Sequence, residues 1–452
     1  MPAIPASVLR LAAALALMTV GSGAMYVVVV VLPAVQQEFG VDRASASLPY
    51  TLTLIGFGIG GVLMGRLADR YGIAVPLAVG ACGLAAGYAL SALAPSLMTF
   101  AIAHGVLLGM LGCSATFSPL VADTSLWFTR RRGIAVTICA SGNYVAGALW
   151  PPIVQRALDA WGWRQTYLAL AVFCLVTMLP LTLAMRRRPP LLDTAAAPGV
   201  PASAAVPAPA IAPAPAAGAE PGDVPAVADG PAPVTMPAVA NPHARPIGMA
   251  PGPLQTLLCI AGVACCVAMS MPQVHIVAYC ADLGFGVARG AEMLSLMLGF
   301  GIVSRIGSGF ICDRIGGLKT LLLGSVMQGI ALILFLPADT VMSLYLVSIL
   351  FGLFQGGIVP MYAIVVRENF PAAETGGRVG LAITATLLGM ALGGWLSGKL
   401  FDLTGSYQAA FVNGIGWNAV NVFIVVYLLL FRRRSRAGAS PYAMGRSTAQ
   451  GA

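Results

Sequence analysis

Arg305 stands alone among apolar and small residues in the stretch GFGIVSRIGSGFICDRIGG, residues 299–317. A guanidinium carries a planar fork of hydrogen-bond donors that matches a carboxylate. An unpaired arginine inside a bilayer costs about 2.5 kcal/mol or more, so this residue needs a partner or water. We predict that Arg305 contacts an organic anion. The alternative is a structural role against the carbonyls of another helix or in an ion pair, but Glu292 lies too far along the same segment, about 20 Å.

The neighbours of Arg305 at helical spacing are small or polar. Gly301, Arg305, Ser308 and Cys312 follow at intervals of four, three and four, so they share one face of a helix. Such a face suits a water-filled cavity rather than lipid. Asp313 lies about 12 Å further along the helix, and half of a hydrocarbon core measures about 15 Å. Arg305 is therefore predicted to lie near the middle of a membrane.

Polar residues on other apolar segments are candidates to line the same cavity. A polar residue in a membrane helix more often makes an interhelical hydrogen bond than a ligand contact, and that structural role stays open for each of them. The predicted substrate contacts besides Arg305 are Tyr26, Asn143, Gln273, Gln355 and Tyr362. The asparagines of the last apolar segment, Asn413, Asn418 and Asn421, are expected to serve packing.

Four titratable residues are candidates for proton coupling. His104 and His275 titrate in a useful range, although a lone histidine in a helix is more often packed than part of a proton relay. Asp123 and Glu292 are acids near the ends of apolar segments. Coupling to protons and exchange for a counter-anion both remain open.

The composition excludes a soluble protein. The chain has 452 residues, of which 58% are hydrophobic and 9% charged, and its mean hydropathy is +0.86. A soluble domain carries about 25% charged residues. The net charge of +9 comes from arginines at the ends of apolar segments, a pattern that orients membrane helices and does not indicate nucleic acid binding. The cysteines and histidines show no metal-ligand spacing, so we predict no cofactor.

Apolar runs of a length that can span a bilayer divide the chain into two halves. A six-helix bundle is expected over residues 1–188, and a second one over 254–434. Between them, residues 189–253 are rich in proline and alanine and are predicted to be a disordered linker. Residues 435–452 form a tail. The predicted segments are 10–33, 45–67, 74–93, 97–121, 133–156, 164–185, 255–280, 290–311, 319–337, 342–366, 378–400 and 409–431.

The distribution of charge predicts the topology. The first apolar run is longer than the hydrophobic part of a signal peptide, so it is read as a spanning helix. Most of the 25 lysines and arginines fall in the tails, in the linker region and in alternate loops. By the positive-inside rule, both termini and the linker are expected in the cytoplasm and the protein in the inner, or plasma, membrane.

The two halves repeat each other. GRLADRYG at 65–72 matches SGFICDRIG at 308–316, which places Asp313 244 residues after Asp69. Gly162 and Gly405, in AWGWRQTYLAL and LTGSYQAAFVN, are separated by nearly the same offset. A duplicated six-helix bundle, as found in secondary transporters, explains both pairs.

The motif GRLADRYG resembles the signature loop between helices two and three of the major facilitator superfamily. The matching residues are Gly65, Asp69, Arg70 and Gly72, with Asp313 and Arg314 in the second half. The resemblance implies an all-helical fold with twelve transmembrane helices in two pseudo-symmetric bundles. It also implies that Asp69 docks near Gly377 and Arg378, and Asp313 near Gly133, when the cytoplasmic side is closed. The basic residues that usually follow the second glycine are replaced here by Ile73 and Ala74.

A narrower resemblance comes from WFTRRRGIAVTICASGNYVAGALWPP, residues 127–152. This aromatic-basic loop and glycine-spaced helix is similar to the monocarboxylate and oxalate/formate branch of the superfamily. That branch implies an anion-binding arginine in helix eight, which is Arg305 here. Gly301 replaces the acid that proton-coupled carriers place one turn before it, and residues 11–33 hold no match for their lysine in helix one.

We therefore expect a secondary transporter for a small mono- or dicarboxylate that works by alternating access, as a monomer in the lipid bilayer. Protons or a counter-anion are the expected coupled species. A multidrug or metabolite efflux proton antiporter of the same superfamily is the alternative, and a membrane-embedded arginine disfavours it for cationic drugs. A non-transporting membrane sensor is a distant alternative. The sequence shows no nucleophile paired with a base at membrane depth, so we do not expect an enzyme.

Overall fold

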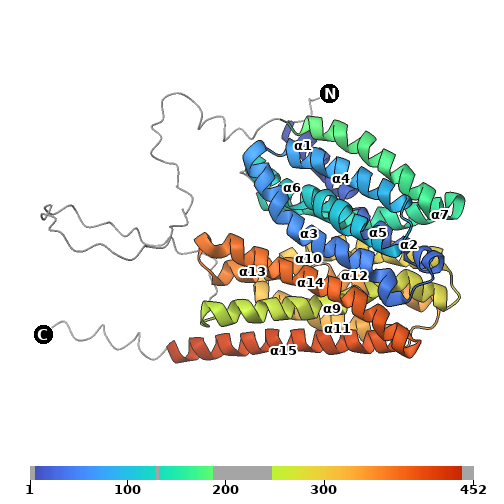
Figure 1. Cartoon of the computed structure of the whole chain (residues 1–452). Helices are drawn as coiled ribbons and strands as arrows, with labels where there is room; N and C mark the ends of the chain where they lie inside the picture. Colours follow the sequence, from blue (N-terminus) through green and yellow to red (C-terminus); the bar gives the residue numbers. More distant parts are fainter. Residues whose placement is uncertain (1–5, 129–131, 187–246, 440–452) are drawn as a thin grey trace, which may run out of the picture.

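The computed structural model describes residues 6–128, 132–186 and 247–439, which form helices joined by short turns. Most of the predicted linker, 189–253, and the end of the predicted tail, 435–452, lie outside these residues. Figure 1 shows the first half, in blue and green, lying beside the second half, in yellow to red.

The described residues of the first half form seven α-helices and one π-helical segment. Asp42 caps the start of the third helix by accepting a hydrogen bond from the Ser45 backbone N–H at 2.8 Å. The elements are α1 (Ala6–Gly21), α2 (Ala24–Phe39), α3 (Arg43–Tyr71), α4 (Ala74–Ala92), α5 (Leu97–Ile102), η1 (Ala103–Cys113), α6 (Ser114–Trp127) and α7 (Arg132–Ala184).

The second half repeats this order. Ile247 lies just before its first helix, and its backbone N–H donates to Asn369 Oδ1 at 2.8 Å. The helices are α9 (Pro251–Asp282), α10 (Val287–Ile315), α11 (Gly317–Phe335), α12 (Val341–Gln355), α13 (Ile358–Asn369), α14 (Ala372–Thr404) and α15 (Tyr407–Ala439).

Among the described residues, 11 stretches are long and apolar enough to cross a membrane. One of them, Ile134–Ala184, is 51 residues long, more than twice the ~20 residues that a single span needs. It is interrupted at Gly162, where φ is 76°. Helix α7 therefore supplies two spans, and the total is twelve. The predicted twelve-helix fold is confirmed.

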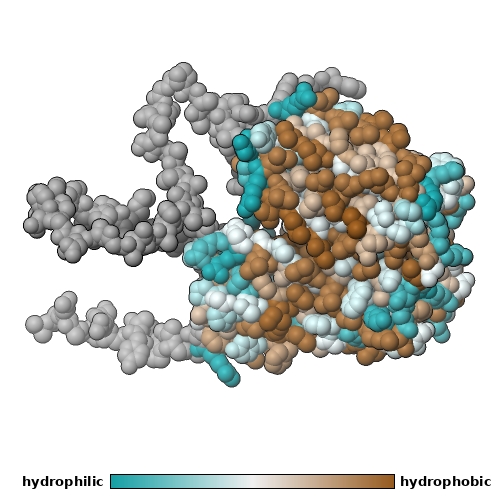
Figure 2. Space-filling view, viewed as in Figure 1, coloured by the Kyte–Doolittle hydropathy of each residue, from teal (hydrophilic) through white to brown (hydrophobic). Residues whose placement is uncertain are grey.

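The outer surface fits a lipid environment. Figure 2 shows apolar residues over the middle of the visible face, with hydrophilic residues gathered toward both ends of the helices. Large apolar side chains in the middle of spans are exposed, for example Val172 at 63% and Phe423 at 71%. This arrangement is stable where hydrocarbon rather than water surrounds the helices.

The molecule has two ends along the helix direction. At the linker end, α7 finishes at Ala184 and α9 begins at Pro251. At the far end, the chain turns at five glycines with positive φ, namely Gly40, Gly162, Gly284, Gly286 and Gly405.

The sequence repeat is also a repeat of backbone geometry. Helix α3 ends at Gly72 with φ 83° and ψ 166°, and α10 ends at Gly316 with φ 89° and ψ 161°. Gly162 and Gly405 also both have positive φ. A residue with a Cβ rarely adopts this conformation, so the repeated glycines are required by the sharp turns that end the helices.

Helices pack most closely where glycines face backbone. A Cβ added at Gly352 of α12 would lie 2.1 Å from the Met297 carbonyl oxygen of α10, and one at Gly356 would lie 2.3 Å from the Gly301 carbonyl oxygen. A side chain at these positions would force the helices apart. Small residues allow this close approach between membrane helices.

Replacing Gly352 should destabilise the protein because α10 would have to move away from α12. We expect Gly352→Ala to lower the stability by about 1–3 kcal/mol, the usual cost of overpacking. Thermal unfolding of the purified protein measures this. The control is Gly416→Ala in α15, where an added Cβ meets nothing within 4 Å, so its melting temperature should match or exceed that of the wild type. Equal losses in both variants would contradict the packing argument.

Candidate functional site

Arg305 lies between the two halves and faces the first one. Its guanidinium carbon is 4.2 Å from the centre of the Tyr144 ring of α7. Its Nε and Nη1 donate to the carbonyl oxygens of Gly356 and Ala140, both at 3.4 Å. Such distances exceed the usual 2.7–3.2 Å. The guanidinium is therefore held by stacking and two long hydrogen bonds, and donors remain for another acceptor.

No carboxylate of the described chain forms an ion pair with Arg305. The ion pairs among these residues join Arg10 to Asp123, Arg43 to Asp282, Arg164 to Glu38 and Arg378 to Glu374. A cation over an aromatic face gains about 0.5–2 kcal/mol, less than the cost of burying an arginine in a bilayer. Water or an anionic ligand would supply the remaining stabilisation.

A break in the tenth span places a free carbonyl beside Arg305. Helix α12 ends at Gln355 and α13 begins at Ile358. The Gly357 backbone N–H at the break donates to Ser304 Oγ at 3.2 Å, and the Gly356 carbonyl faces Arg305. Irregular backbone is tolerated at membrane depth where neighbouring side chains satisfy it or where it lines a cavity.

The first span is broken at a similar depth, between Gly21 and Ala24. A Cβ at Gly21 would lie 2.2 Å from Thr116 Oγ1, so α1 and α6 touch there. The fourth span contains the π-helical turns of η1. Such turns are frequent at functional sites because they shift the facing side chains. Three of the spans are thus irregular in their middle parts.

Tyr26 and Asn143 face each other across the first half. The Tyr26 hydroxyl donates to Asn143 Oδ1 at 2.7 Å. A Cβ at Gly147 would meet both the Tyr26 ring, at 2.9 Å, and Leu298 of α10, at 2.3 Å. Since Asn143 directly precedes the tyrosine that stacks on Arg305, the Tyr26–Asn143 pair forms the wall of the site on the first half.

Gln273 and Gln355 form the corresponding pair in the second half. Gln273 Nε2 donates to Gln355 Oε1 at 3.0 Å. Gln355 is buried, and its Nε2 has no hydrogen-bond partner among the described residues. A buried amide with an unused donor costs about 1–3 kcal/mol. Because Gln355 directly precedes Gly356, this donor lies one residue from the carbonyl that Arg305 contacts.

Tyr362 does not share this site. Its hydroxyl donates to Asn421 Oδ1 of α15 at 2.9 Å, and Asn421 in turn donates to Ser325 Oγ of α11 at 2.8 Å. The three buried residues tie the peripheral helices to α13. Tyr362 follows Gln355 by seven residues, a spacing that places both on one face of an unbroken helix, but the break at Gly356 and Gly357 lies between them. The predicted packing role of Asn418 and Asn421 agrees with their contacts to Ser325.

All four predicted proton-coupling residues are hydrogen-bonded to other protein groups. His104 is buried against the Phe100 carbonyl oxygen, at 3.0 Å, and the Tyr167 hydroxyl, at 3.2 Å. Asp123 accepts hydrogen bonds from Arg10 Nε at 3.1 Å and Nη2 at 2.9 Å. Glu292 accepts a hydrogen bond from the Tyr345 hydroxyl and is exposed. The fourth, His275, lies at the far end, where it contacts Tyr407.

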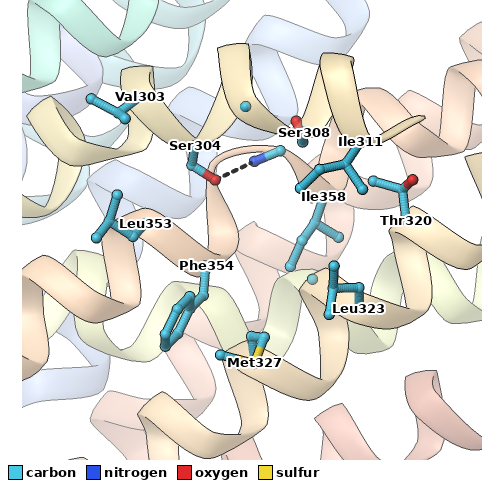
Figure 3. A pocket seen from close by; sticks show the side chains of 13 residues that line it. Val303, Ser304, Ser308, Ile311, Thr320, Leu323, Met327, Leu353, Phe354 and Ile358 are labelled. Carbon is cyan, nitrogen blue, oxygen red and sulfur yellow. Dashed lines mark hydrogen bonds between the residues drawn. The ribbon is translucent and has the colours of Figure 1, made fainter. Parts of the chain in front are cut away.

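A separate apolar cavity lies beside the break. It has a volume of about 380 Å³ and is bordered by α10, α11, α12 and α13. Figure 3 shows Ser304 at its edge, bonded to the Gly357 backbone, with Leu323, Met327 and Phe354 around it. The hydroxyls of Ser308 and Thr320 donate to backbone carbonyls of Arg305 and Gly316. Arg305 is not among the lining residues, so this cavity is distinct from the site described above.

The signature loops lie at the linker end and are exposed. Asp69 and Arg70 finish α3, and Asp313 and Arg314 finish α10. A Cβ added at Gly65 or at Gly377 would meet nothing within 4 Å. The docking of Asp69 near Gly377 is therefore not formed in this conformation, and it stays a prediction for the closed linker end. The surroundings of Gly133, the expected partner region of Asp313, lie outside the described part of the structure, so this docking also stays a prediction.

The sequence profile of the Major Facilitator Superfamily matches residues 13–341 and 256–448. The chain belongs to the Major Facilitator Superfamily. The two overlapping matches agree with the repeat of the two halves. The chain is accordingly a multi-pass membrane transporter rather than an enzyme, as the sequence predicted.

Relatives within the superfamily include carriers of different kinds. Monocarboxylate transporter 13 of Rattus norvegicus is 27% identical over 384 residues, which cover 81% of this chain and 75% of that protein. An agnestins efflux protein of Paecilomyces divaricatus is 20% identical over 407 residues, or 89% of this chain and 82% of that one. The predicted resemblance to the monocarboxylate branch is confirmed by the first of these relatives.

A solved structure supports the fold. A bacterial homologue of the human lysosomal transporter Spinster, in an inward-facing and unoccupied conformation, superposes with a TM-score of 0.64. It is 14% identical, and the alignment covers 96% of this chain and 98% of that chain. At this identity the likeness speaks for the major facilitator fold alone.

Sequence reasoning missed two parts of the geometry. Tyr144, which stacks on Arg305, was not selected, although it directly follows the predicted Asn143. Arg43, at the start of α3, was not selected either, yet it binds three residues of the second half. No pattern along the sequence identifies either residue, because both roles depend on the meeting of the two halves.

Asp123 should be structural rather than proton-coupling. The Arg10 and Asp123 side chains are 7% and 8% exposed, and Arg10 also stacks on Trp127 at 4.3 Å. We expect Asp123→Asn to cost about 3–5 kcal/mol because it leaves a buried charge unpaired. The double variant Arg10→Met/Asp123→Leu should recover much of this loss. Thermal unfolding of all three proteins measures it, and an Asp123→Asn protein as stable as the wild type would contradict the assignment.

Proposed function

We propose that this transporter moves a small organic anion, a mono- or dicarboxylate, and that Arg305 binds its carboxylate between the two halves. The observation that carries this proposal is a half-buried guanidinium in the membrane region with no carboxylate partner among the described residues. Its unused donors match two carboxylate oxygens. The relationship to a monocarboxylate transporter supports the same class of substrate.

The remainder of the site would fix the substrate. Tyr144 holds the guanidinium plane by stacking, which leaves the edge of the fork for the anion. The unpaired Gln355 Nε2, from the residue before Gly356, is a candidate second donor, and Tyr26 with Asn143 borders the site from the first half. The pocket therefore offers several donors to an anion, and the residues named here bring no carboxylate to repel it.

The arrangement of contacts fits alternating access. Hydrogen bonds join the halves at the far end, through Arg43 and Ala44, and about two helical turns deeper, through Thr51 and Ser295. At the linker end, Asp69 and Asp313 are exposed. We assign this conformation as open toward the linker end. The positive-inside rule makes that end cytoplasmic, with both termini inside the cell and the chain in the inner, or plasma, membrane.

The placement of titratable groups favours exchange of anions over a proton relay at the substrate. Asp123, Glu292 and His104 are bonded elsewhere in the molecule, and Gly301 stands one turn before Arg305. A proton taken up beside the bound substrate would then have to be carried by the substrate itself. Transport driven by a counter-anion with the pH gradient collapsed would distinguish exchange from symport.

Efflux of a metabolite remains the second candidate because an efflux protein is among the relatives. The two candidates differ in the chemistry of the ligand. Cationic drugs would need an acidic residue in the middle of the membrane to offset their charge. The charged residue found there is Arg305, which would repel them.

Substituting Arg305 should strongly weaken anion binding without loss of the fold. A ligand that binds the folded state raises the melting temperature by mass action. We expect small carboxylates to stabilise the wild type, and Arg305→Gln to weaken their affinity about 100-fold, or ~3 kcal/mol. Arg305→Lys should bind about tenfold more weakly than the wild type, because a lysine cannot offer the same fork.

The matched control is Arg314→Gln, which removes an exposed arginine from the same helix and should leave binding unchanged. Sugars, amino acids and cationic drugs complete the panel. Stabilisation by a neutral or cationic compound that persists in Arg305→Gln would overturn the carboxylate assignment and make Arg305 structural.

Asp69 should matter for movement rather than for binding. Its carboxylate can dock on the positive end of α14 only when the linker end closes. We expect Asp69→Asn to reduce transport in proteoliposomes at least about tenfold while binding in detergent stays as in the wild type. Asp339→Asn, which alters an exposed acid at the far end, is the control and should transport normally. Normal transport by Asp69→Asn would contradict this role.

A further inference from the structure

The two halves are held together at the far end by a cluster of charged and polar residues, here called the Arg43 gate. It consists of Arg43, Asp282, Asp402 and Tyr407. Arg43 Nη2 donates to Asp282 Oδ1 at 2.6 Å, and its Nη1 donates to the Tyr407 hydroxyl at 3.0 Å. Arg43 comes from the first half and its partners from the second, so the cluster must open whenever the halves separate at this end.

The start of α3 is part of the same gate. The Arg43 and Ala44 backbone N–H groups donate to the two carboxylate oxygens of Asp402, at 2.9 and 2.8 Å. These N–H groups have no partner within their own helix, and the carboxylate also meets the positive end of the helix dipole. The Arg43 guanidinium also stacks on the Phe401 ring at 4.6 Å. One arginine thus collects most of the polar contacts that close the far end.

His275 is connected to this gate through Tyr407. Its Nε2 lies 2.8 Å from the Gly394 carbonyl oxygen, and its Nδ1 lies 3.1 Å from the Tyr407 hydroxyl. A carbonyl can only accept, so Nε2 carries the hydrogen. In the neutral ring Nδ1 is then an acceptor, and the Tyr407 hydroxyl donates to it. That leaves the Tyr407 oxygen free to accept from Arg43, and the chain of hydrogen bonds is complete.

A proton on Nδ1 of His275 would break this chain of hydrogen bonds. The imidazolium has two donors and no acceptor, so the Tyr407 hydroxyl would lose its acceptor and its oxygen would receive hydrogens from both Arg43 and His275. Two cations would then meet at one phenol. His275 is buried, and a buried charge without a partner is costly. In the separated state, water could solvate the imidazolium instead.

We infer that the Arg43 gate is sensitive to pH, and that protonation of His275 opens it. Because a proton binds better to the open far end than to the closed one, lowering the pH must shift the population toward the open state. This inference concerns the closure of the far end and stands apart from the identity of the substrate.

The other groups around His275 do not supply the same switch. Asp282 and Asp402 are the acids of the gate, and Arg43 is its cation. Tyr279 lies against Tyr407, with 5.6 Å between ring centres, and Tyr50 packs near Gly394. Carboxylates ordinarily titrate near pH 4 and tyrosines near pH 10. Between pH 5.5 and 8, His275 is the member of this cluster expected to change charge.

Hydrogen–deuterium exchange of the purified protein in lipid nanodiscs tests the inference without a substrate. Peptides that cover residues 40–50 and 400–410 report the gate, and rates are corrected for the intrinsic effect of pH. In the wild type we expect exchange at the gate to be about tenfold faster at pH 5.5 than at pH 8, which corresponds to one unit of differential proton affinity. His275→Gln keeps a donor and an acceptor but does not titrate, so its exchange should not depend on pH.

The matched control is His104→Gln, which removes the buried histidine of the first half and should respond to pH as the wild type does. If His275→Gln disturbs the fold, peptides of α9 outside the gate will also exchange faster. Tyr407→Phe then provides the test, because it cuts the link to His275 while Asp282 and Asp402 still hold Arg43. A flat response in the wild type, or a wild-type response in His275→Gln or in Tyr407→Phe, would overturn the inference.

Discussion

The close contact between α10 and the broken tenth span holds the rest of the site in place. Gly352 and Gly356 face the carbonyls of Met297 and Gly301 and let the two backbones approach so closely that no side chain fits between them. The approach places the carbonyl of Gly356 beside Arg305. It also places the hydroxyl of Ser304 where it accepts a hydrogen bond from the backbone N–H of Gly357 at the break. Without it, the backbone groups at the break would be unsatisfied at membrane depth, where each costs several kcal/mol. The close packing, the helix break and the position of the arginine therefore depend on one another.

The two ends of the molecule differ in how the halves meet. The far end is closed by direct hydrogen bonds and ion pairs centred on Arg43, whereas at the linker end the acids of the two signature loops are exposed. The sequence repeat makes the halves similar in backbone geometry, but it does not make the ends equivalent. Arg43 and Asp402 are charged residues that only the far end brings together, so that end can close through an ion pair network. The linker end would rely on acids facing helix N-termini, an interaction of about 0.3–1 kcal/mol at an exposed site.

The buried polar residues of this transporter fall into two kinds. His104 with Tyr167, and Tyr362 with Asn421, satisfy each other inside one half, so they need not change during a movement of the halves. Arg305 and Arg43 lie where the halves meet, and both of them, like Gln355, keep donors that the described protein groups do not fully use. Polar groups that are incompletely satisfied in one state are the ones through which a ligand or a proton can shift the balance between states.

The sequence alone determined the class of protein, the twelve spans, the repeat of the halves and the superfamily. Each of these follows from local patterns: apolar runs of sufficient length, glycines that end helices, and a motif that recurs at a fixed offset. It also singled out Arg305, because a lone charge among apolar residues is visible without any structure.

Only the tertiary structure decided which polar residues accompany Arg305. Tyr362 shares the spacing of Gln355 but turns toward α15 after the break, and Tyr144 gives no signal in the sequence yet stacks on the guanidinium. Arg43 and His275 are separated by more than 200 residues, and their connection exists because α3, α9 and α15 converge at the far end. Spacing along one helix predicts which residues share a face, but the partner of that face is fixed by how the helices pack.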